Sequence, residues 1–249
     1  MRRVLQGYAL RHWAHLAEAA PEMPPENLRT LRSQAKSLRR QVDRVLHAAD
    51  GRLMQPQSQR NNRRPGASSD WTWQPDVWKG PVSPRGIAGA ANRSTIGEEI
   101  KVFHDCPLAE IALRQIVNDE VSVFAAFGLR LEVFRFEGSF LSLAIELPDE
   151  LRHSIQSNHI LALRTFIEQE RGSEIFARLN IRNGPNTARL VREIDPRYSE
   201  VETEFDLAYA QFNPARIEAM WVEIILESPA MNAVNLRDFS LGRRSRAGV

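Results

Sequence analysis

The sequence contains a single cysteine, Cys106, among its 249 residues. One thiol excludes an internal disulfide framework and any zinc site built from several cysteines. Long apolar runs are also missing, since no stretch approaches the roughly 18 apolar residues of a membrane-spanning helix. Charged and bulky polar residues follow Arg2 and Arg3, so the amino terminus lacks the apolar segment of a secretory signal. We therefore expect no membrane span and, by default, a cytoplasmic location.

Motifs for common cofactors are absent as well. The sequence has no phosphate-binding glycine loop, no dinucleotide glycine fingerprint and no pair of histidines at metal-ligand spacing. We therefore predict no cofactor and no metal site, and we do not expect a nucleic-acid partner. The sequence assigns no catalytic residue, and an enzyme is the less favoured class.

The small net charge of +2 hides a strong asymmetry along the chain. Residues 1–93 carry 16 Lys and Arg against 7 Asp and Glu, which gives +9. The remaining residues carry 17 against 24, which gives −7. This asymmetry indicates more than one structural region. We predict a helical hairpin or coiled coil over residues 1–53, a linker or strap over 54–95, and a β-sandwich domain over 96–249.

The first region has apolar residues at helical spacing, and we expect a break at Pro21 and the Pro24-Pro25 pair. A second helix follows, and we expect Gly51 to end it as a C-cap residue. Its apolar positions alternate steps of three and four, which is the pattern of a coiled-coil seam. These positions are Leu28, Leu31, Ala35, Leu38, Val42, Val45 and Ala49.

This seam permits three interpretations. The favoured one is an antiparallel hairpin packed on itself or on the main domain. The second is a homo-oligomer that associates through Leu28, Leu31, Leu38, Val42 and Val45. In the third, the arginines beside the seam contact nucleic acid or an anionic membrane, although a charged helix face is usually only solvated.

The middle region has the composition of a linker, but it holds three of the five tryptophans in the segment DWTWQPDVWKGP. Trp71 and Trp73 share one side of an extended chain because side chains alternate there, and Trp78 follows closely. We favour a strap in which these rings anchor the segment to the edge of the main domain. The alternative is an exposed platform on which a sugar or another partner stacks.

The third region alternates apolar and polar residues, which is typical of antiparallel sheets with one buried face. In FLSLAIELP, for example, Leu141, Leu143 and Ile145 fall on one side of the strand. A slip of the apolar phase between Leu236 and Phe239 predicts a bulge there. Ten strands with short connections predict an antiparallel two-sheet sandwich of jelly-roll type. The expected strands cover residues 99–104, 110–117, 129–137, 140–147, 159–168, 174–181, 187–194, 201–207, 219–227 and 233–242.

Three groups of residues are candidates for chemistry. His104, Asp105 and Cys106 in VFHDCP suggest a nucleophile and a base, but Pro107 ends the strand at once, so we favour a structural corner. Glu202, Glu204 and Asp206 line one side of a strand, and we interpret them as a solvated face. In the loop RNGPN, the side chains of Arg182, Asn183 and Asn186 suit a polar ligand such as a sugar, although turns favour the same residue types.

Three segments together resemble an alphaproteobacterial family that is classified as a domain of unknown function. They are FHDCPLAEIALRQ, FEGSFLSLAIELP and the long run from Phe205 to Ala247. The resemblance extends over most of the chain and implies no activity or catalytic residue. The ending VNLRDFSLGRR is more loosely similar to the closing strand of carbohydrate-binding jelly rolls, which is an analogy of fold alone.

We therefore predict a non-enzymatic module that binds a saccharide or a partner protein through the sandwich. The ligand-binding residues that we predict are Trp71, Trp73, Trp78, Arg182, Asn183 and Asn186. The main alternative is a structural or assembly protein of a cell envelope or a phage-like particle. An enzyme that acts on polysaccharide is the third choice.

Overall fold

The computed structural model describes residues 2–54, 69–108, 110–118, 125–195, 198 and 200–246. The chain divides into two compact units, Met1–Leu46 and His47–Val249. Residues 55–68, which belong to the predicted linker or strap of residues 54–95, lie outside the described residues. In the part of the chain that the structure describes, none of the helices is both long and apolar enough to cross a membrane.

The amino-terminal unit is helical, as predicted. Helix α1 spans Arg2–Ala19, the short 3₁₀ helix η1 spans Ala20–Glu22, and α2 runs over Pro25–Met54. The break falls at the prolines because the ring of proline removes a backbone donor and clashes inside a helix. Pro25 itself starts α2, in the first turn, where the missing N–H is no loss.

The expected helix end at Gly51 is wrong, because α2 continues to Met54. Gly51 is buried, and a Cβ atom at this position would lie 1.9 Å from the carbonyl oxygen of Lys79. The glycine therefore permits a close approach of two backbones and does not cap the helix. Nearby, the Nε2 atom of His47 hydrogen-bonds the carbonyl oxygen of Asp76 at 2.8 Å.

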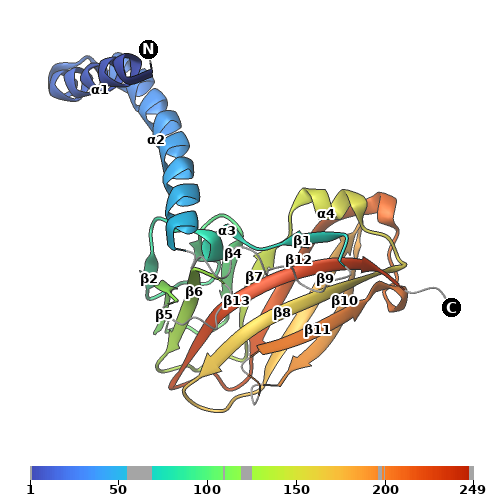
Figure 1. The fold of residues 1–249 in the computed structure, drawn as a ribbon. Coiled ribbons are helices and arrows are strands. Elements are labelled where there is room, and N and C mark those ends of the chain that lie inside the picture. Colours follow the sequence, from blue (N-terminus) through green and yellow to red (C-terminus); the bar gives the residue numbers. More distant parts are fainter. Residues whose placement is uncertain are drawn as a thin grey trace. The chain divides into compact units, whose positions relative to one another are not determined.

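The second unit is an antiparallel two-sheet sandwich of jelly-roll type, which confirms the predicted fold class (Figure 1). One sheet has the order β11-β8-β13-β6-β5-β2, with β1 paired to β13, and the other has the order β10-β9-β12-β7-β4-β3. The chain changes sheet at most of its connections after β4, as in a jelly roll. The strands are β1 (Trp71–Trp73), β2 (Gly86–Ala88), β3 (Thr95–Ile96), β4 (Ile100–His104), β5 (Ile111–Val117), β6 (Phe127–Val133), β7 (Leu141–Glu146), β8 (His159–Gln169), β9 (Ile175–Asn183), β10 (Asn186–Ile194), β11 (Glu200–Asp206), β12 (Ile217–Leu226) and β13 (Asn232–Ser245).

Each of the ten predicted strands is present, with ends that shift by a few residues. The predicted bulge is present too, as a register shift between Leu236 and Asp238 where β13 pairs with β8. Short helices fill some connections: α3 (Asp76–Lys79), α4 (Asp149–Ser154), η3 (Leu207–Tyr209) and η4 (Pro214–Arg216). The core lies between the sheets and collects the apolar phase of each strand, for example Val102, Leu143 and Val222.

The tryptophan segment is a strap on the edge of the seven-stranded sheet. Strand β1 pairs with the end of β13, where Trp71 lies opposite Arg243 and Trp73 opposite Leu241. Strand β6 pairs only with the first part of β13, Asn232–Leu236, and the strap pairs with the last part, which β6 leaves uncovered. Trp78 in α3 is 0% exposed and stacks on Phe239 with ring centroids 5.4 Å apart.

The segment VFHDCP forms a structural corner at the end of β4. His104 is buried and donates from Nε2 to the carbonyl oxygen of Ala90 at 2.9 Å. Asp105 is exposed and accepts hydrogen bonds from the hydroxyl and backbone N–H of Ser139. The buried Cys106 donates from Sγ to the carbonyl oxygen of Leu108. The three side chains have separate partners, so they form no nucleophile-base pair.

We expect Trp78→Ala to destabilise the sandwich by about 3–5 kcal/mol, the range for removing a buried aromatic ring. The indole also donates from Nε1 to the carbonyl oxygen of Leu236 at 3.2 Å. In the variant, this buried oxygen would lose its hydrogen bond to the indole. Urea denaturation gives the free energy of unfolding. The matched variant Trp71→Ala removes a half-buried indole from the same strap. An equal loss in both variants would contradict the anchoring role of Trp78.

Asp105→Asn should lower the melting temperature at neutral pH but not in acid. The Ser139 hydroxyl that donates to Asp105 holds the pKa of this carboxyl below its ordinary value of 3.8, and the N–H groups of Ser139 and Phe140 act in the same direction. A folded pKa below the unfolded one means that the carboxylate stabilises the fold above pH 3.8 and that this contribution disappears as the pH falls through the folded pKa. Thermal melting of both proteins from neutral to acidic pH checks this, and equal melting temperatures at pH 7 would refute it.

Candidate functional site

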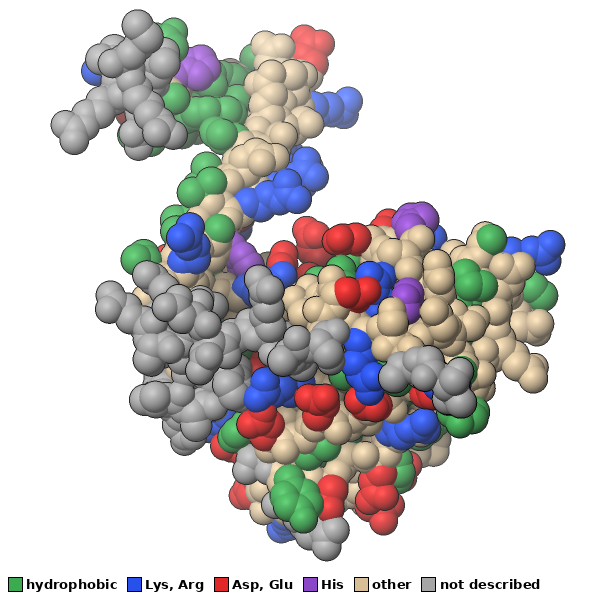
Figure 2. Space-filling model, turned by 45° about the vertical axis from the view of Figure 1, so that its right-hand side comes forward, with side chains coloured by type: hydrophobic (Ala, Val, Ile, Leu, Met, Phe, Trp, Pro, Cys, Tyr) green, Lys and Arg blue, Asp and Glu red, His purple; other side chains and the backbone are tan. Residues whose placement is uncertain are grey.

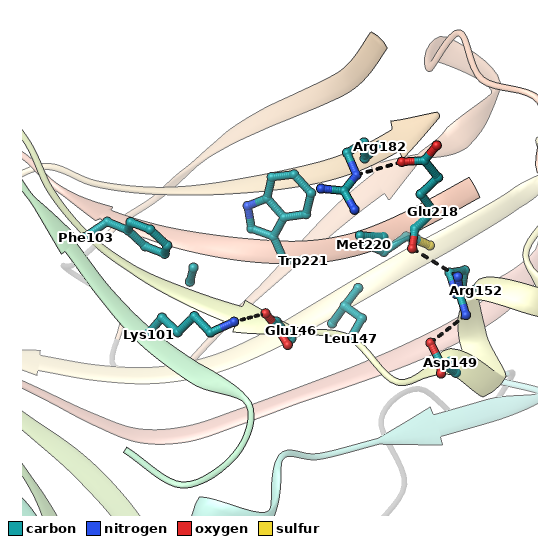
Figure 3. Close-up of a pocket in the computed structure, with 12 residues that line it drawn as sticks. Lys101, Phe103, Glu146, Leu147, Asp149, Arg152, Arg182, Glu218, Met220 and Trp221 are labelled. Carbon is teal, nitrogen blue, oxygen red and sulfur yellow. Dashed lines mark hydrogen bonds and ion pairs between the residues drawn. The ribbon is translucent and has the colours of Figure 1, made fainter. Parts of the chain in front are cut away.

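A pocket with a volume of about 440 Å³ lies on the outer face of the six-stranded sheet (Figure 3). Strands β4, β7, β12 and β9 form its floor, and α4 contributes to one wall. The volume falls within the range of small-molecule sites, about 300–1,000 Å³. Residues on the other phase of these strands, such as Val102 and Ile145, belong to the core. Alternation along each strand therefore places residues such as Lys101, Phe103 and Glu146 on the outer face. The lining consists of Lys101, Phe103, Ala144, Glu146, Leu147, Asp149, Arg152, Arg182, Glu218, Ala219, Met220 and Trp221.

Trp221 occupies the middle of this surface. Its direct partner across the strands is Glu146 on β7, and Figure 3 shows its indole between the Phe103 ring and Arg182. The indole is half-buried, although β12 places it on the outward phase between the core residues Met220 and Val222. A large aromatic ring on the outer phase of a strand offers an apolar face to a ligand.

The orientation of Trp221 is fixed by a carboxylate beside it. The indole Nε1 donates to Oε1 of Glu223 at 2.8 Å. The other oxygen of Glu223 accepts from Nε of Arg178 at 2.8 Å, and the two groups form an ion pair. The Glu223 side chain is only 13% exposed, so these hydrogen bonds are shielded from water. The ring is therefore held in one position before any ligand arrives.

A bulge brings Glu218 into the pocket. Where β12 pairs with β9, Ile217 lies opposite Asn183 and Ala219 opposite Arg182, so Glu218 is the extra residue. Bulges re-aim side chains in this way and often lie next to functional sites. The carboxylate of Glu218 pairs with Nε of Arg182 at 3.1 Å. The bulge therefore places a carboxylate next to Arg182 at this end of the pocket.

Two more ion pairs complete the polar lining. Lys101 on β4 pairs with Glu146 on β7. Arg152 on α4 pairs with Asp149 at 2.9 Å and donates to the backbone carbonyl of Glu218 at 3.0 Å. The Nε atom of Arg152 is buried and has no hydrogen-bond partner among the described residues. The pocket thus presents hydrogen-bond donors and acceptors in alternation around an aromatic centre.

The structure separates the site residues that the sequence predicts. Arg182 lines the pocket. Asn183 and Asn186 lie opposite each other at the β9-β10 hairpin, and Nδ2 of Asn183 donates to the carbonyl oxygen of Asn213 at 2.7 Å. The hairpin continues the strand that carries Arg182, so these two residues lie just past its end of the pocket.

The strap tryptophans do not reach this pocket, because β1 belongs to the other sheet. The rings of Trp71 and Trp73 are half-buried and pack against the core. Trp78 is fully buried, and a buried ring has no face for a ligand from solution. We therefore correct the prediction for Trp78, which has a structural role.

The sequence reasoning missed most of the pocket, and Trp221 above all. One signal was present: in IEAMWVEIIL the apolar phase runs through Met220, Val222 and Ile224, so Trp221 and Glu223 fall on the polar phase. Lys101, Glu146 and Glu218 come from separate strands, and the sequence does not show that they meet. Among the residues that the structure describes, no cluster of three or more His, Cys, Asp or Glu side chains is placed to hold a metal ion.

Comparisons with solved structures find chains of similar fold at low identity. The enzymatically active domain of tailspike protein 4 of bacteriophage CBA120 matches with 5% identity and a TM-score of 0.42, over 59% of this chain and 19% of that chain. The chain thus spans about a fifth of the tailspike chain. The family 11 carbohydrate-binding module of Clostridium thermocellum, in complex with a mixed-linked tetrasaccharide, matches with 9% identity and a TM-score of 0.41, over 63% and 96%. The CBM22-1 xylan-binding domain of Paenibacillus barcinonensis Xyn10C matches with 7% identity and a TM-score of 0.37, over 66% and 94%.

None of the curated proteins matches this chain. A protein family, in contrast, covers its full length: residues 1–249 match DUF6478, a family of unknown function. The chain belongs to that family, which confirms the resemblance to a family of unknown function. The alphaproteobacterial origin that the resemblance implied stays a prediction.

Proposed function

We propose that this member of the DUF6478 family is a non-enzymatic binding module that recognises a saccharide in the pocket on its six-stranded sheet. The observation that carries the proposal is the fixed, half-exposed indole of Trp221 at the centre of that pocket. A pyranose ring has an apolar C–H face that packs on an indole, and its hydroxyl groups need donors and acceptors around the edge. The paired side chains around Trp221 supply both.

The shape of the pocket favours a chain of sugars over a single ring. Its lining extends from β4 to β9, which are three inter-strand spacings apart. With about 4.8 Å between neighbouring strands, the floor is about 14 Å wide. Phe103 on β4 and Arg182 on β9 lie at opposite sides of this floor, with Trp221 between them. An oligosaccharide would therefore contact all three.

Binding without catalysis fits the lining better than glycoside hydrolysis does. A glycosidase uses two carboxyl groups, one as proton donor and one as nucleophile or base. Each of the pocket carboxylates, Glu146, Asp149 and Glu218, forms an ion pair with a neighbouring cation. Such pairs position a polar ligand and leave no carboxylate dedicated to proton transfer.

We expect Trp221→Ala to weaken saccharide binding by roughly tenfold or more, because the stacking face is lost. A glycan array identifies an oligosaccharide that binds, and isothermal titration calorimetry then measures the dissociation constant. The double variant Trp71→Ala/Trp73→Ala removes the strap rings, which the sequence predicted as an alternative platform. Circular dichroism confirms that both variants are folded.

The two variants distinguish a site in the pocket around Trp221 from a site on the strap. Loss of binding in Trp221→Ala with normal binding in the strap variant supports the pocket. Loss of binding in the strap variant alone would move the site to Trp71 and Trp73. A protein that binds no saccharide on the array would refute the proposed function.

The helical unit favours self-association as a second property. On α2 the side chains of Leu38, Val42 and Val45 are 41%, 47% and 68% exposed, so this part of the apolar seam is not covered. In a parallel pair, Gln34 would face Arg39 of the second copy, and the seam would bring no like charges together. We propose that two or more copies associate through this seam, as a binding module would for avidity or as an assembly protein would for structure.

The double variant Leu31→Asp/Leu38→Asp should dissociate the oligomer, because it places charges inside the seam. Light scattering after size-exclusion chromatography gives the mass. Ser33→Asp/Ser37→Asp adds the same charges to exposed positions of α2 outside the seam and should leave the mass unchanged. In a binding module, calorimetry with a single-site oligosaccharide gives the same affinity for all these proteins. A monomeric natural chain would contradict self-association.

A further inference from the structure

The charged side chains that line the pocket cancel one another in pairs. Three of them are cations and three are anions. Each cation has its ion-pair partner inside the same lining: Lys101 with Glu146, Arg152 with Asp149, and Arg182 with Glu218. The pairs lie on the β4-β7 side, on α4 and on the β9-β12 side, so no part of the pocket has an excess of one sign. Figure 2 shows that acidic and basic side chains are mixed over one face of the molecule.

Paired charges in a pocket bind neutral ligands more favourably than anionic ones. A hydroxyl group donates one hydrogen bond and accepts others, so it can bridge a carboxylate and a neighbouring ammonium or guanidinium group. A ligand carboxylate or sulfate only accepts, and it would lie beside Glu146 or Glu218 at every position near Lys101 or Arg182. The attraction to the cation is then offset by repulsion from its partner.

Arg152 offers no free cation to an anionic ligand. One of its terminal nitrogens pairs with Asp149, and the other donates to the backbone carbonyl of Glu218. Its Nε atom is buried and cannot be reached from solution. The guanidinium group of Arg152 is therefore engaged within the protein, like the charged groups of Lys101 and Arg182.

We infer that the pocket selects an uncharged oligosaccharide and discriminates against uronate-bearing and sulfated chains. This inference rests on the proposed saccharide-binding function and adds the charge of the ligand to it. The ion pairs stay intact when the ligand binds, and each ligand hydroxyl group hydrogen-bonds to both members of a pair. Glu146 and Glu218 are the residues that exclude anions, while Trp221 supports the apolar face of the sugar.

The first test compares neutral oligosaccharides with their own acids. The probes are gluco-, galacto- and manno-oligosaccharides, each printed on an array beside the product in which the C6 hydroxyl groups are oxidised to carboxylates. We expect the natural protein to bind at least one neutral probe and to bind its oxidised form roughly tenfold more weakly, since each added carboxylate meets a pocket carboxylate. Binding of the neutral probe should also change little between low and high salt, because no net charge is neutralised.

Charge variants test which residues exclude the acid. In the double variant Glu146→Gln/Glu218→Gln, Lys101 and Arg182 lose their partners, and the oxidised probe should bind at least as well as the neutral one, with a strong dependence on salt. The matched control is Glu200→Gln/Glu204→Gln, which removes the same charge from ion pairs with Arg164 and Arg244 on the other sheet. This control should keep the preference of the natural protein for the neutral probe.

The possible results separate the inference from the function on which it rests. Equal binding of neutral and oxidised probes by the natural protein would overturn the inference and leave saccharide binding in place. A control that changes preference as much as the pocket variant would also overturn it, since the effect would then come from the overall charge. Binding of no probe, neutral or oxidised, would overturn both.

Discussion

The burial of the Trp78 indole against strand β13 is the contact on which the rest of the sandwich depends. The ring is fully buried, and its N–H is satisfied by the carbonyl oxygen of Leu236 beside the bulge of β13. Its position fixes α3, where the backbone N–H of Asp76 donates to the carboxylate of Glu99 at 3.2 Å. The backbone carbonyl of Glu99 in turn accepts from the N–H of Glu146, a residue of the pocket, at 2.8 Å. Burial raises the pKa of Glu99, because removing its carboxylate from water disfavours the charged form. The link from α3 to the pocket therefore includes a desolvated carboxylate.

The sandwich could be predicted from the sequence because its information is local. A strand with one buried face alternates apolar and polar residues whatever its partner is, so the strand around Leu141 could be recognised without knowing what covers it. The slip of phase before Phe239 marked the bulge for the same reason. Gly51 misled the sequence reasoning because glycine both ends helices and permits close backbone contacts. Only the position of Lys79 distinguishes the two roles here.

The pocket could be predicted only in part, because it depends on which strands lie side by side. Arg182 was predicted from its loop, but its partner Glu218 comes from β12 and is turned toward it by a bulge. Trp221 could have been found from its place on the polar phase of β12. The three tryptophans of the strap were predicted as ligand-binding residues instead, although the favoured interpretation was a strap that these rings anchor. For Trp78 the ligand-binding prediction fails, because a short segment can bury a ring in a core built by distant strands.

The ion pairs that line the pocket contribute little to stability, and the proposed binding function gives them a role. Exposed ion pairs contribute only about 0–1 kcal/mol each, so three pairs around Trp221 add little to the fold. They do give every side of the ring both a donor and an acceptor, which a polyhydroxylated ligand needs. Under the proposed function, a single site of this kind would bind weakly, because most of its contacts replace hydrogen bonds to water. Copies that associate through the seam of α2, as proposed, would hold several such sites against one polymer, and avidity would then raise the overall affinity.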